Sequence, residues 1–175
     1  MSASGSSFAR AAAAEAGRTR VFRHLRAPRE RVYAAFLDPE AVRRWKVPEG
    51  MTCQVHSFDG REGGTYRVSL ITDGPSAARK SGPSTDTYHG RFVRLVPNRR
   101  IVEEDEFETD DPAMQGEMTI IIELSDAHRD GFLGTDLVAV HEGLPRGLSR
   151  ADNDLGWRMA LEKLAALVEE PLGNS

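Results

Sequence analysis

Apolar and polar residues alternate along the middle of the chain with the period-two spacing that is typical of β-strands. A first strand is expected from about residue 18 until Ala27-Pro28, where proline restricts the residue before it. Six more strands are expected over residues 52–58, 65–72, 87–96, 99–109, 117–124 and 136–141. Turns rich in Gly, or formed by Pro97-Asn98, separate most of them, so successive strands should pair as antiparallel hairpins.

Two short helices are expected between the first strand and the second. Apolar residues recur at helical spacing over 28–37, and the charged residues between them can face water. Asp38 then offers an N-cap oxygen, and Pro39 occupies a first helical position where no N–H is needed. The second helix is therefore expected over 39–46, ending at Trp45.

A long helix closes the chain, beginning at Ser149 and ending before Pro171. Its predicted apolar stripe comprises Leu155, Leu161, Leu164 and Val168. A curved sheet must bury one face, and this helix is the only element large enough to cover it. The expected fold class is therefore α+β, a curved antiparallel sheet of about seven strands around a C-terminal helix.

The length of 175 residues fits one domain, expected over 18–170, with tails at 1–17 and 171–175. The segment 73–86, rich in Pro, Gly and Ser, is expected to be a flexible loop. A net charge of -4 gives no overall field for nucleic acid. Neither a membrane span nor a secretory signal is recognisable, so a cytoplasmic location is expected.

No cofactor or metal is expected. Cys53 is the only cysteine, which excludes an intrachain disulfide and a thiolate cluster. The five histidines are too widely spaced to form a local zinc pair, and no nucleophile elbow or phosphate-binding Gly loop occurs.

The acidic run 103–108 is the most informative feature, because alternate residues of a strand face opposite sides. A two-residue turn at Pro97-Asn98 would pair Arg91 with Glu104, His89 with Glu106, and Val93 with Val102, on the solvent face. The concave face would then collect Tyr88, Gly90, Phe92, Ile101, Glu103, Asp105 and Phe107.

Two carboxylates on a concave face need partners, since burying unpaired charges costs several kcal/mol or shifts their pKa. Arg67, Arg94, a ligand or water could supply them. Alternatively, the curvature of the sheet leaves both groups at a solvated mouth.

Three further residue types are candidates for the same face. The strand 117–124 places Met118 and alternate apolar residues on one side, and His141 shares the inward phase of its own strand. Trp45 and Trp157 could close the two ends of a cavity, although each is equally suited to filling core volume.

The order of elements and several local motifs resemble the START/SRPBCC superfamily, in particular the bacterial homologues of the activator of the heat-shock ATPase. The resemblance covers about residues 18–169. Its motifs are Ala27-Pro28, Asp38-Pro39-Glu40 before Arg44-Trp45, Gly63-Gly64-Thr65-Tyr66, Gly90-Arg91-Phe92 leading to Pro97, His141-Glu142-Gly143-Leu144-Pro145, and Gly156-Trp157 with Leu161 and Leu164.

This resemblance implies the helix-grip fold, with a cavity between the concave face and the last helix that holds lipids, polyketides, hormones or other apolar molecules. We therefore expect binding of a small apolar or amphipathic ligand in a cavity of roughly 300–1,000 Å³. The candidate ligand-binding residues are Trp45, Tyr66, Tyr88, Phe92, Glu103, Asp105, Met118, His141 and Trp157.

Two alternatives stay open. The chain could be an enzyme of cyclase, dehydratase or hydrolase type that uses Glu103, Asp105 or His141 as general acid or base. It could instead be a regulator of a partner protein, of the chaperone type, which would show an exposed apolar patch. A homodimer is also left open.

Overall fold

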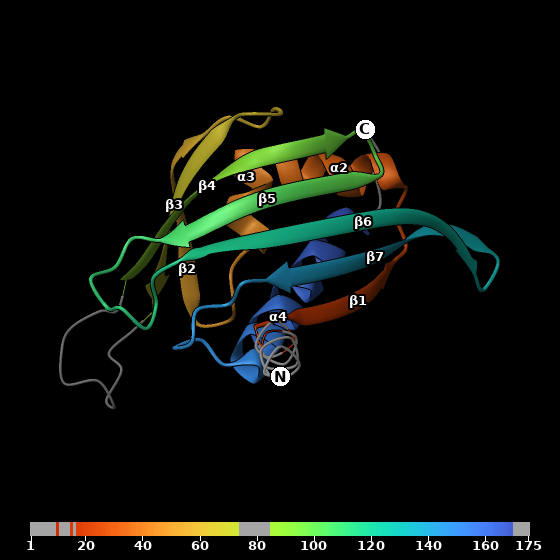
Figure 1. Ribbon diagram of the computed structural model, residues 1–175. Coiled ribbons are helices and arrows are strands. Elements are labelled where there is room, and N and C mark those ends of the chain that lie inside the picture. Colours follow the sequence, from red (N-terminus) through yellow and green to blue (C-terminus); the bar gives the residue numbers. More distant parts are fainter. Residues whose placement is uncertain (1–9, 11–14, 16, 74–84, 170–175) are drawn as a thin grey trace.

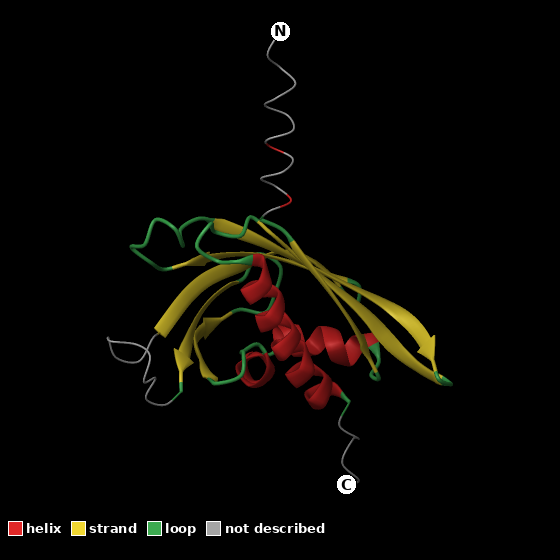
Figure 2. Ribbon diagram, turned by 90° about the horizontal axis from the view of Figure 1, so that it is seen from below, coloured by secondary structure: helices red, strands yellow, loops and turns green. Residues whose placement is uncertain are grey.

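In the computed structural model, which describes residues 10, 15, 17–73 and 85–169, the chain forms one curved antiparallel sheet with helices on its concave side (Figures 1 and 2). The strands lie in the order β1-β7-β6-β5-β4-β3-β2. They are β1 (Thr19–Leu25), β2 (Met51–Phe58), β3 (Thr65–Thr72), β4 (Thr85–Val96), β5 (Arg100–Phe107), β6 (Glu117–Arg129) and β7 (Phe132–Glu142). The helices are α2 (Arg29–Leu37), α3 (Pro39–Trp45) and α4 (Arg150–Val168).

This is the α+β helix-grip architecture that the sequence predicts. Three predicted segments fall largely outside the described residues: the tails 1–17 and 171–175, and the loop 73–86 between residues 74 and 84. The last two residues of that loop belong to β4, which begins at Thr85.

The helix signals at residues 38 and 149 act as predicted. The side chain of Asp38 accepts a hydrogen bond from the backbone N–H of Glu40 at 3.0 Å, and that of Ser149 accepts one from Asp152 at 3.0 Å. The predicted stripe of α4 is wrong at Leu155, which is 53% exposed. It lies two residues from the buried Asn153, and a step of about 200° around a helix of 3.6 residues per turn reaches the opposite face.

The hairpin of β6 and β7 is longer than predicted. The two strands continue to Arg129 and Phe132 around the dipeptide Asp130-Gly131, whose φ angles are 52° and 80°. Such a two-residue turn with positive φ matches the right-handed twist of the strands that it joins. The extension was missed because residues 125–129 are polar or small and carry no apolar alternation.

The β4–β5 hairpin differs from the prediction in two places that compensate each other. The loop has three residues, with Asn98 at φ 62°, and Val96 pairs with Arg100. A bulge at Val93 adds one residue to β4, so Arg94 rather than Val93 pairs with Val102. Beyond the bulge Arg91 pairs with Glu104, and His89 with Glu106, as predicted.

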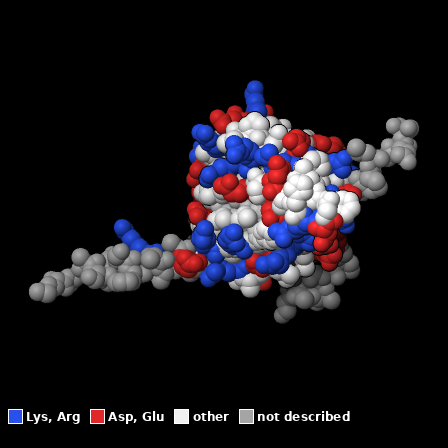
Figure 3. Space-filling view, turned by 90° about the vertical axis from the view of Figure 1, so that its right-hand side faces the viewer, with Lys and Arg blue, Asp and Glu red and all other residues white. Residues whose placement is uncertain are grey.

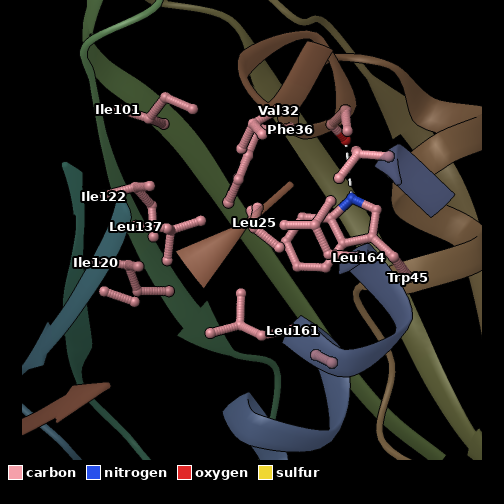
Figure 4. Close-up of a cluster of buried hydrophobic side chains, with 14 of the residues drawn as sticks. Leu25, Val32, Phe36, Trp45, Ile101, Ile120, Ile122, Leu137, Leu161 and Leu164 are labelled. Carbon is pink, nitrogen blue, oxygen red and sulfur yellow. Dashed lines mark hydrogen bonds between the residues drawn. The ribbon is translucent and has the colours of Figure 1, made fainter. Parts of the chain in front are cut away.

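The core lies between the concave face and all three helices, as Figure 4 shows. The indole Nε1–H of Trp45 donates a hydrogen bond to the carbonyl of Ala35 at 2.9 Å, and its ring packs edge-on against Phe36. α4 lies beside β1, where Asn153 Nδ2 donates to Thr19 Oγ1 at 2.8 Å. This packing fixes α4 against the edge of the sheet.

On the face drawn in Figure 3, positive and negative side chains are interspersed. Within residues 17–73 and 85–169, no helix combines the length and the apolar character that a membrane crossing requires.

Candidate functional site

Two rows of inward-facing residues cross the middle of the sheet. In the first, Tyr66 of β3 lies opposite Gly90 of β4, which lies opposite Asp105 of β5, and Met118 of β6 follows. In the second, Phe92, Glu103, Ile120 and His141 are aligned in the same way from β4 to β7. All of these residues except glycine have buried side chains, so the predicted concave face is confirmed.

Gly90 allows the two polar residues of the first row to meet. A β-carbon at this position would overlap the Oδ1 of Asp105 and the hydroxyl of Tyr66. Because glycine leaves that space free, the Tyr66 hydroxyl donates a hydrogen bond to Asp105 Oδ1 across the backbone of β4.

The second carboxylate of the concave face is neutralised by a lysine. Lys46 follows α3 directly, and its Nζ lies 2.6 Å from Glu103 Oε2. The side chains of Lys46 and Glu103 are only 13% and 1% exposed, which makes this a buried ion pair. Lys46 Nζ also lies 5.8 Å from the ring centroid of Tyr66.

The two arginines proposed as partners do not pair with these carboxylates. Arg67 faces the other side of β3 and bonds Glu108 at 2.8 Å, and Arg94 is exposed. A solvated mouth is excluded as well, because Glu103 and Asp105 are only 1% and 4% exposed. Arg67 follows the inward residue Tyr66 directly and therefore faces outward, and Arg94 faces outward after the bulge at Val93. The cation comes instead from Lys46, at the end of α3.

Burial, followed by the negative charge of Glu103, raises the pKa of Asp105 to about 7, against the opposing effects of Lys46 and the Tyr66 hydroxyl. Burial also raises the pKa of Tyr66 and of Tyr88 well above the ordinary value, so both phenols stay neutral. Burial lowers the pKa of Lys46, but Glu103 and Asp105 raise it more, and the net shift is upward. Lys46 is therefore a permanent cation, while Asp105 titrates near neutral pH.

His141 is held between two side chains that fix its tautomer. The indole Nε1–H of Trp157 donates to His141 Nδ1 at 3.3 Å, so the ring proton lies on Nε2, which is 3.3 Å from the Met118 sulfur. Burial, with a smaller contribution from Lys46, lowers the pKa of His141 to about 4. The imidazole is therefore neutral at pH 7, with both nitrogens engaged.

These residues border a pocket of about 210 Å³ between the sheet and α4. It is smaller than the cavity that the sequence predicts. Five predicted site residues line it, namely Tyr88, Asp105, Met118, His141 and Trp157. Four others, namely Trp45, Tyr66, Phe92 and Glu103, are absent from its wall.

The three aromatic residues among these four belong to the hydrophobic core. Tyr66 and Phe92 pack against each other with ring centroids 5.1 Å apart, and Phe58 lies against both. Trp45 and Phe92 are fully buried. These rings therefore fill core volume and do not line the pocket.

Several lining residues were not among the predicted ligand-binding residues. They come from the segment after α3, from the sheet, and from α4 with the loop before it: Lys46, Val47, Pro48, Leu70, Phe107, Ile120, Leu148, Asp152, Asn153, Gly156 and Ala160. Strand alternation places Phe107 and Ile120 on the inward faces of their strands, and it could have indicated Leu70 in the same way. Nothing in the local sequence places Lys46 inside, because its position depends on how α3 packs against the sheet.

Asp105 offers one free oxygen to this pocket. Its Oδ1 accepts from Tyr66, while no donor among the described residues bonds its Oδ2. No described side-chain oxygen or nitrogen is both fully enclosed and without a partner, so Oδ2 must be accessible. Asp105 is part of the pocket wall, so its accessible Oδ2 can take a donor there.

The chain is similar to several known proteins. A family model described as "Activator of Hsp90 ATPase homolog 1-like protein" matches residues 26–169. A solved structure from Chromobacterium violaceum is 38% identical, over 89% of this chain and 99% of that chain, with a TM-score of 0.76. No curated protein matches.

Two more distant structures share the fold. A protein from Rhodobacter sphaeroides is 20% identical, over 88% of this chain and 93% of that chain, with a TM-score of 0.69. The AHSA1 protein from Silicibacter pomeroyi is 19% identical, over 87% of this chain and 97% of that chain, with a TM-score of 0.67.

Proposed function

The chain belongs to the family of Activator of Hsp90 ATPase homolog 1-like proteins, and we propose that it binds a small apolar or amphipathic molecule in the pocket between its sheet and α4. The observation that carries this proposal is the composition of the pocket wall. Aromatic and aliphatic side chains form most of it, and Asp105 lies among them. An apolar wall with few polar groups is the usual construction of small-molecule sites.

The size of the pocket limits the ligand. A volume of about 210 Å³ lies below the range of roughly 300–1,000 Å³ that is usual for small-molecule sites. A compact molecule about the size of one aromatic ring with a short arm fits this space better than a long lipid chain. Apolar contacts with Tyr88, Phe107 and Trp157 would supply the affinity, and a polar group at Asp105 the orientation.

The arrangement favours binding over catalysis. Glu103 is held by Lys46 and does not reach the pocket wall, and both ring nitrogens of His141 are engaged. Of the three groups considered as general acid or base, only Asp105 has a free atom in the pocket. One of these three groups thus has a free atom, which meets the need of a binder, whereas acid–base catalysis ordinarily needs a second. The other carboxylate of the wall, Asp152, is exposed at the first turn of α4.

A role in docking a partner protein has less support. Phe22 and Phe132 are exposed by 44% and 56%, on β1 and at the start of β7. However, the guanidinium groups of Arg129 and Arg26 lie over these two rings, at 5.7 and 4.5 Å from their centroids. The arginines thus break up the apolar surface that a docking patch requires.

Native mass spectrometry of the freshly purified protein tests the proposal, by detecting a small molecule that dissociates on collisional activation. Gly156→Leu provides a blocked pocket, because Gly156 lines it and a β-carbon there meets only Pro48, at 3.9 Å. Gly156→Ala is the matched control, since it adds one methyl group. Retention of the same molecule by Gly156→Leu and by Gly156→Ala would contradict binding in this pocket.

A further inference from the structure

The buried charges behind the pocket do not balance. Lys46 contributes one positive charge, while Glu103 and ionised Asp105 contribute two negative charges. Lys46 is already bonded to Glu103 at 2.6 Å, which leaves Asp105 with a neutral donor, the Tyr66 hydroxyl. With Asp105 ionised, this cluster therefore lacks one positive charge.

A positive charge that balances ionised Asp105 can be placed in the pocket. The residue is 4% exposed and is part of the pocket wall, and its Oδ2 has no bonding partner among the described residues. An unpaired buried carboxylate oxygen is costly unless it receives a proton or a donor. A ligand that carries a cationic donor can occupy this position.

The remaining walls also suit a cation. Lys46 also lines the pocket, but its charge is already paired with Glu103 at 2.6 Å. His141 is neutral and its ring nitrogens are occupied, so it adds no further positive charge. Tyr88, Phe107 and Trp157 line the pocket with aromatic surface, which attracts ammonium groups. A second carboxylate, Asp152, lies on the wall at the first turn of α4.

We propose that the ligand is a small apolar amine, bound as its ammonium ion with an N–H donated to Asp105 Oδ2 and its apolar part against Tyr88 and Trp157. This inference rests on the proposed function and specifies its ligand class. Anions are disfavoured by the same charge count, because they would add a third negative charge beside Glu103, ionised Asp105 and the single cation Lys46.

Binding of an ammonium ion must be linked to the protonation of Asp105. The charged and titratable groups that face Asp105 from the surrounding elements are Glu103, Lys46, Tyr66, Tyr88, His141 and Asp152. Lys46 stays charged, and Tyr66, Tyr88 and His141 stay neutral near pH 7. Asp105 is thus the group that gains a proton as the pH falls through about 7, and that proton competes with the amine.

Three probes of one shape test this assignment by isothermal titration calorimetry: phenethylamine, 2-phenylethanol and phenylacetate. At about pH 8 phenethylamine should bind about tenfold or more tightly than 2-phenylethanol, the scale of a charge-assisted hydrogen bond. Phenylacetate should bind most weakly. Lowering the pH to about 6 should weaken phenethylamine by about tenfold, with little effect on 2-phenylethanol.

Asp105→Asn removes the negative charge of the site while keeping the size of the side chain. It should reduce the preference for the amine to about threefold or less while changing 2-phenylethanol affinity by about twofold at most. The control is Glu106→Gln, which removes a charge from the next residue, on the outer face of β5. It should leave all three affinities unchanged.

The outcomes distinguish this inference from the proposed function. If 2-phenylethanol binds as tightly as phenethylamine, the amine assignment is wrong although the pocket binds small molecules. If Asp105→Asn still prefers phenethylamine to 2-phenylethanol by the original factor, the amine assignment is also wrong. If none of the probes binds, the amine assignment fails, and the native mass spectrum with the Gly156 variants decides the proposed function separately.

Discussion

Replacement of Lys46 by methionine is the most severe test of how the interior of this protein is held together. Methionine keeps most of the volume and the apolar stem of lysine but removes its charge. Glu103, which is 1% exposed, would then lose its only described partner, with Asp105 two residues away on the same face. The interior would hold two acidic groups and no cation.

The expected loss is large because the surviving partner is buried. Breaking a buried ion pair by removing one member typically costs about 3–5 kcal/mol. For a domain of this size each kcal/mol corresponds to about 2–4 °C, so the melting temperature should fall by roughly 6–20 °C. The double variant Lys46→Met/Glu103→Leu removes both charges, and its stability should be close to that of the unaltered protein or above it.

Urea unfolding followed by circular dichroism measures these differences, provided that the denaturant slope stays constant across the variants. Arg91→Met is the control, since it removes a cation that pairs with Glu104, the next residue along β5, on an exposed surface. That change should be small, because exposed ion pairs contribute little. Lowering the pH toward about 4 should restore part of the loss in Lys46→Met, since a protonated carboxyl group costs less to bury.

Two results would refute the reasoning. A loss in Lys46→Met as small as in Arg91→Met would mean that Glu103 finds water or another donor without difficulty. A double variant as unstable as Lys46→Met would mean that lysine stabilises by packing rather than by charge.

Three further predictions concern single groups. Gly90→Ala should lower the free energy of unfolding by about 1–3 kcal/mol, because its methyl group separates Tyr66 from Asp105; urea unfolding measures this. Gly156→Ala should raise it by about 0.5–1 kcal/mol in the same assay, since the position is helical and uncrowded. Two groups should give opposite pH dependences over almost the same range: the raised pKa of Asp105 makes stability fall as the pH rises from about 4 to about 7, and the lowered pKa of His141 makes it rise from about 4 to about 6.5. The two effects should nearly cancel in the unaltered protein, so melting curves of Asp105→Asn should show stability that rises with pH over this range and those of His141→Gln stability that falls. A variant whose pH dependence equals that of the unaltered protein would contradict the assignment of its group.

The fold could be predicted from the sequence because it depends on local signals. The caps at Asp38 and Ser149 mark helix starts, and alternation along 103–108 orients Glu103 and Asp105 inward whatever the neighbouring strands do. An inward orientation belongs to the strand itself, so an error in the register between strands does not affect it.

The partners of these carboxylates could not be predicted in the same way. Lys46 reaches Glu103 from 57 positions away in sequence, and only the packing of α3 against the sheet brings them together. Similarly, alternation identifies Phe92 and Tyr66 as inward residues, but it does not tell whether an inward aromatic ring fills the core or lines a pocket. The volume left over depends on the packing of all side chains at once.

The bulge in β4 has a consequence for how the length of this strand can vary. Val93 and Arg94 both face outward, so Phe92 and Leu95 can both face the interior. Deletion of Val93 alone would leave a regular ladder in which Gly90 still lies opposite Asp105 and Phe92 opposite Glu103. Deletion of Arg91 would instead move a side chain into the gap between Tyr66 and Asp105 that Gly90 keeps open. Relatives that keep the tyrosine–carboxylate pair are therefore expected to differ in length at the bulge, and not between Tyr88 and Phe92.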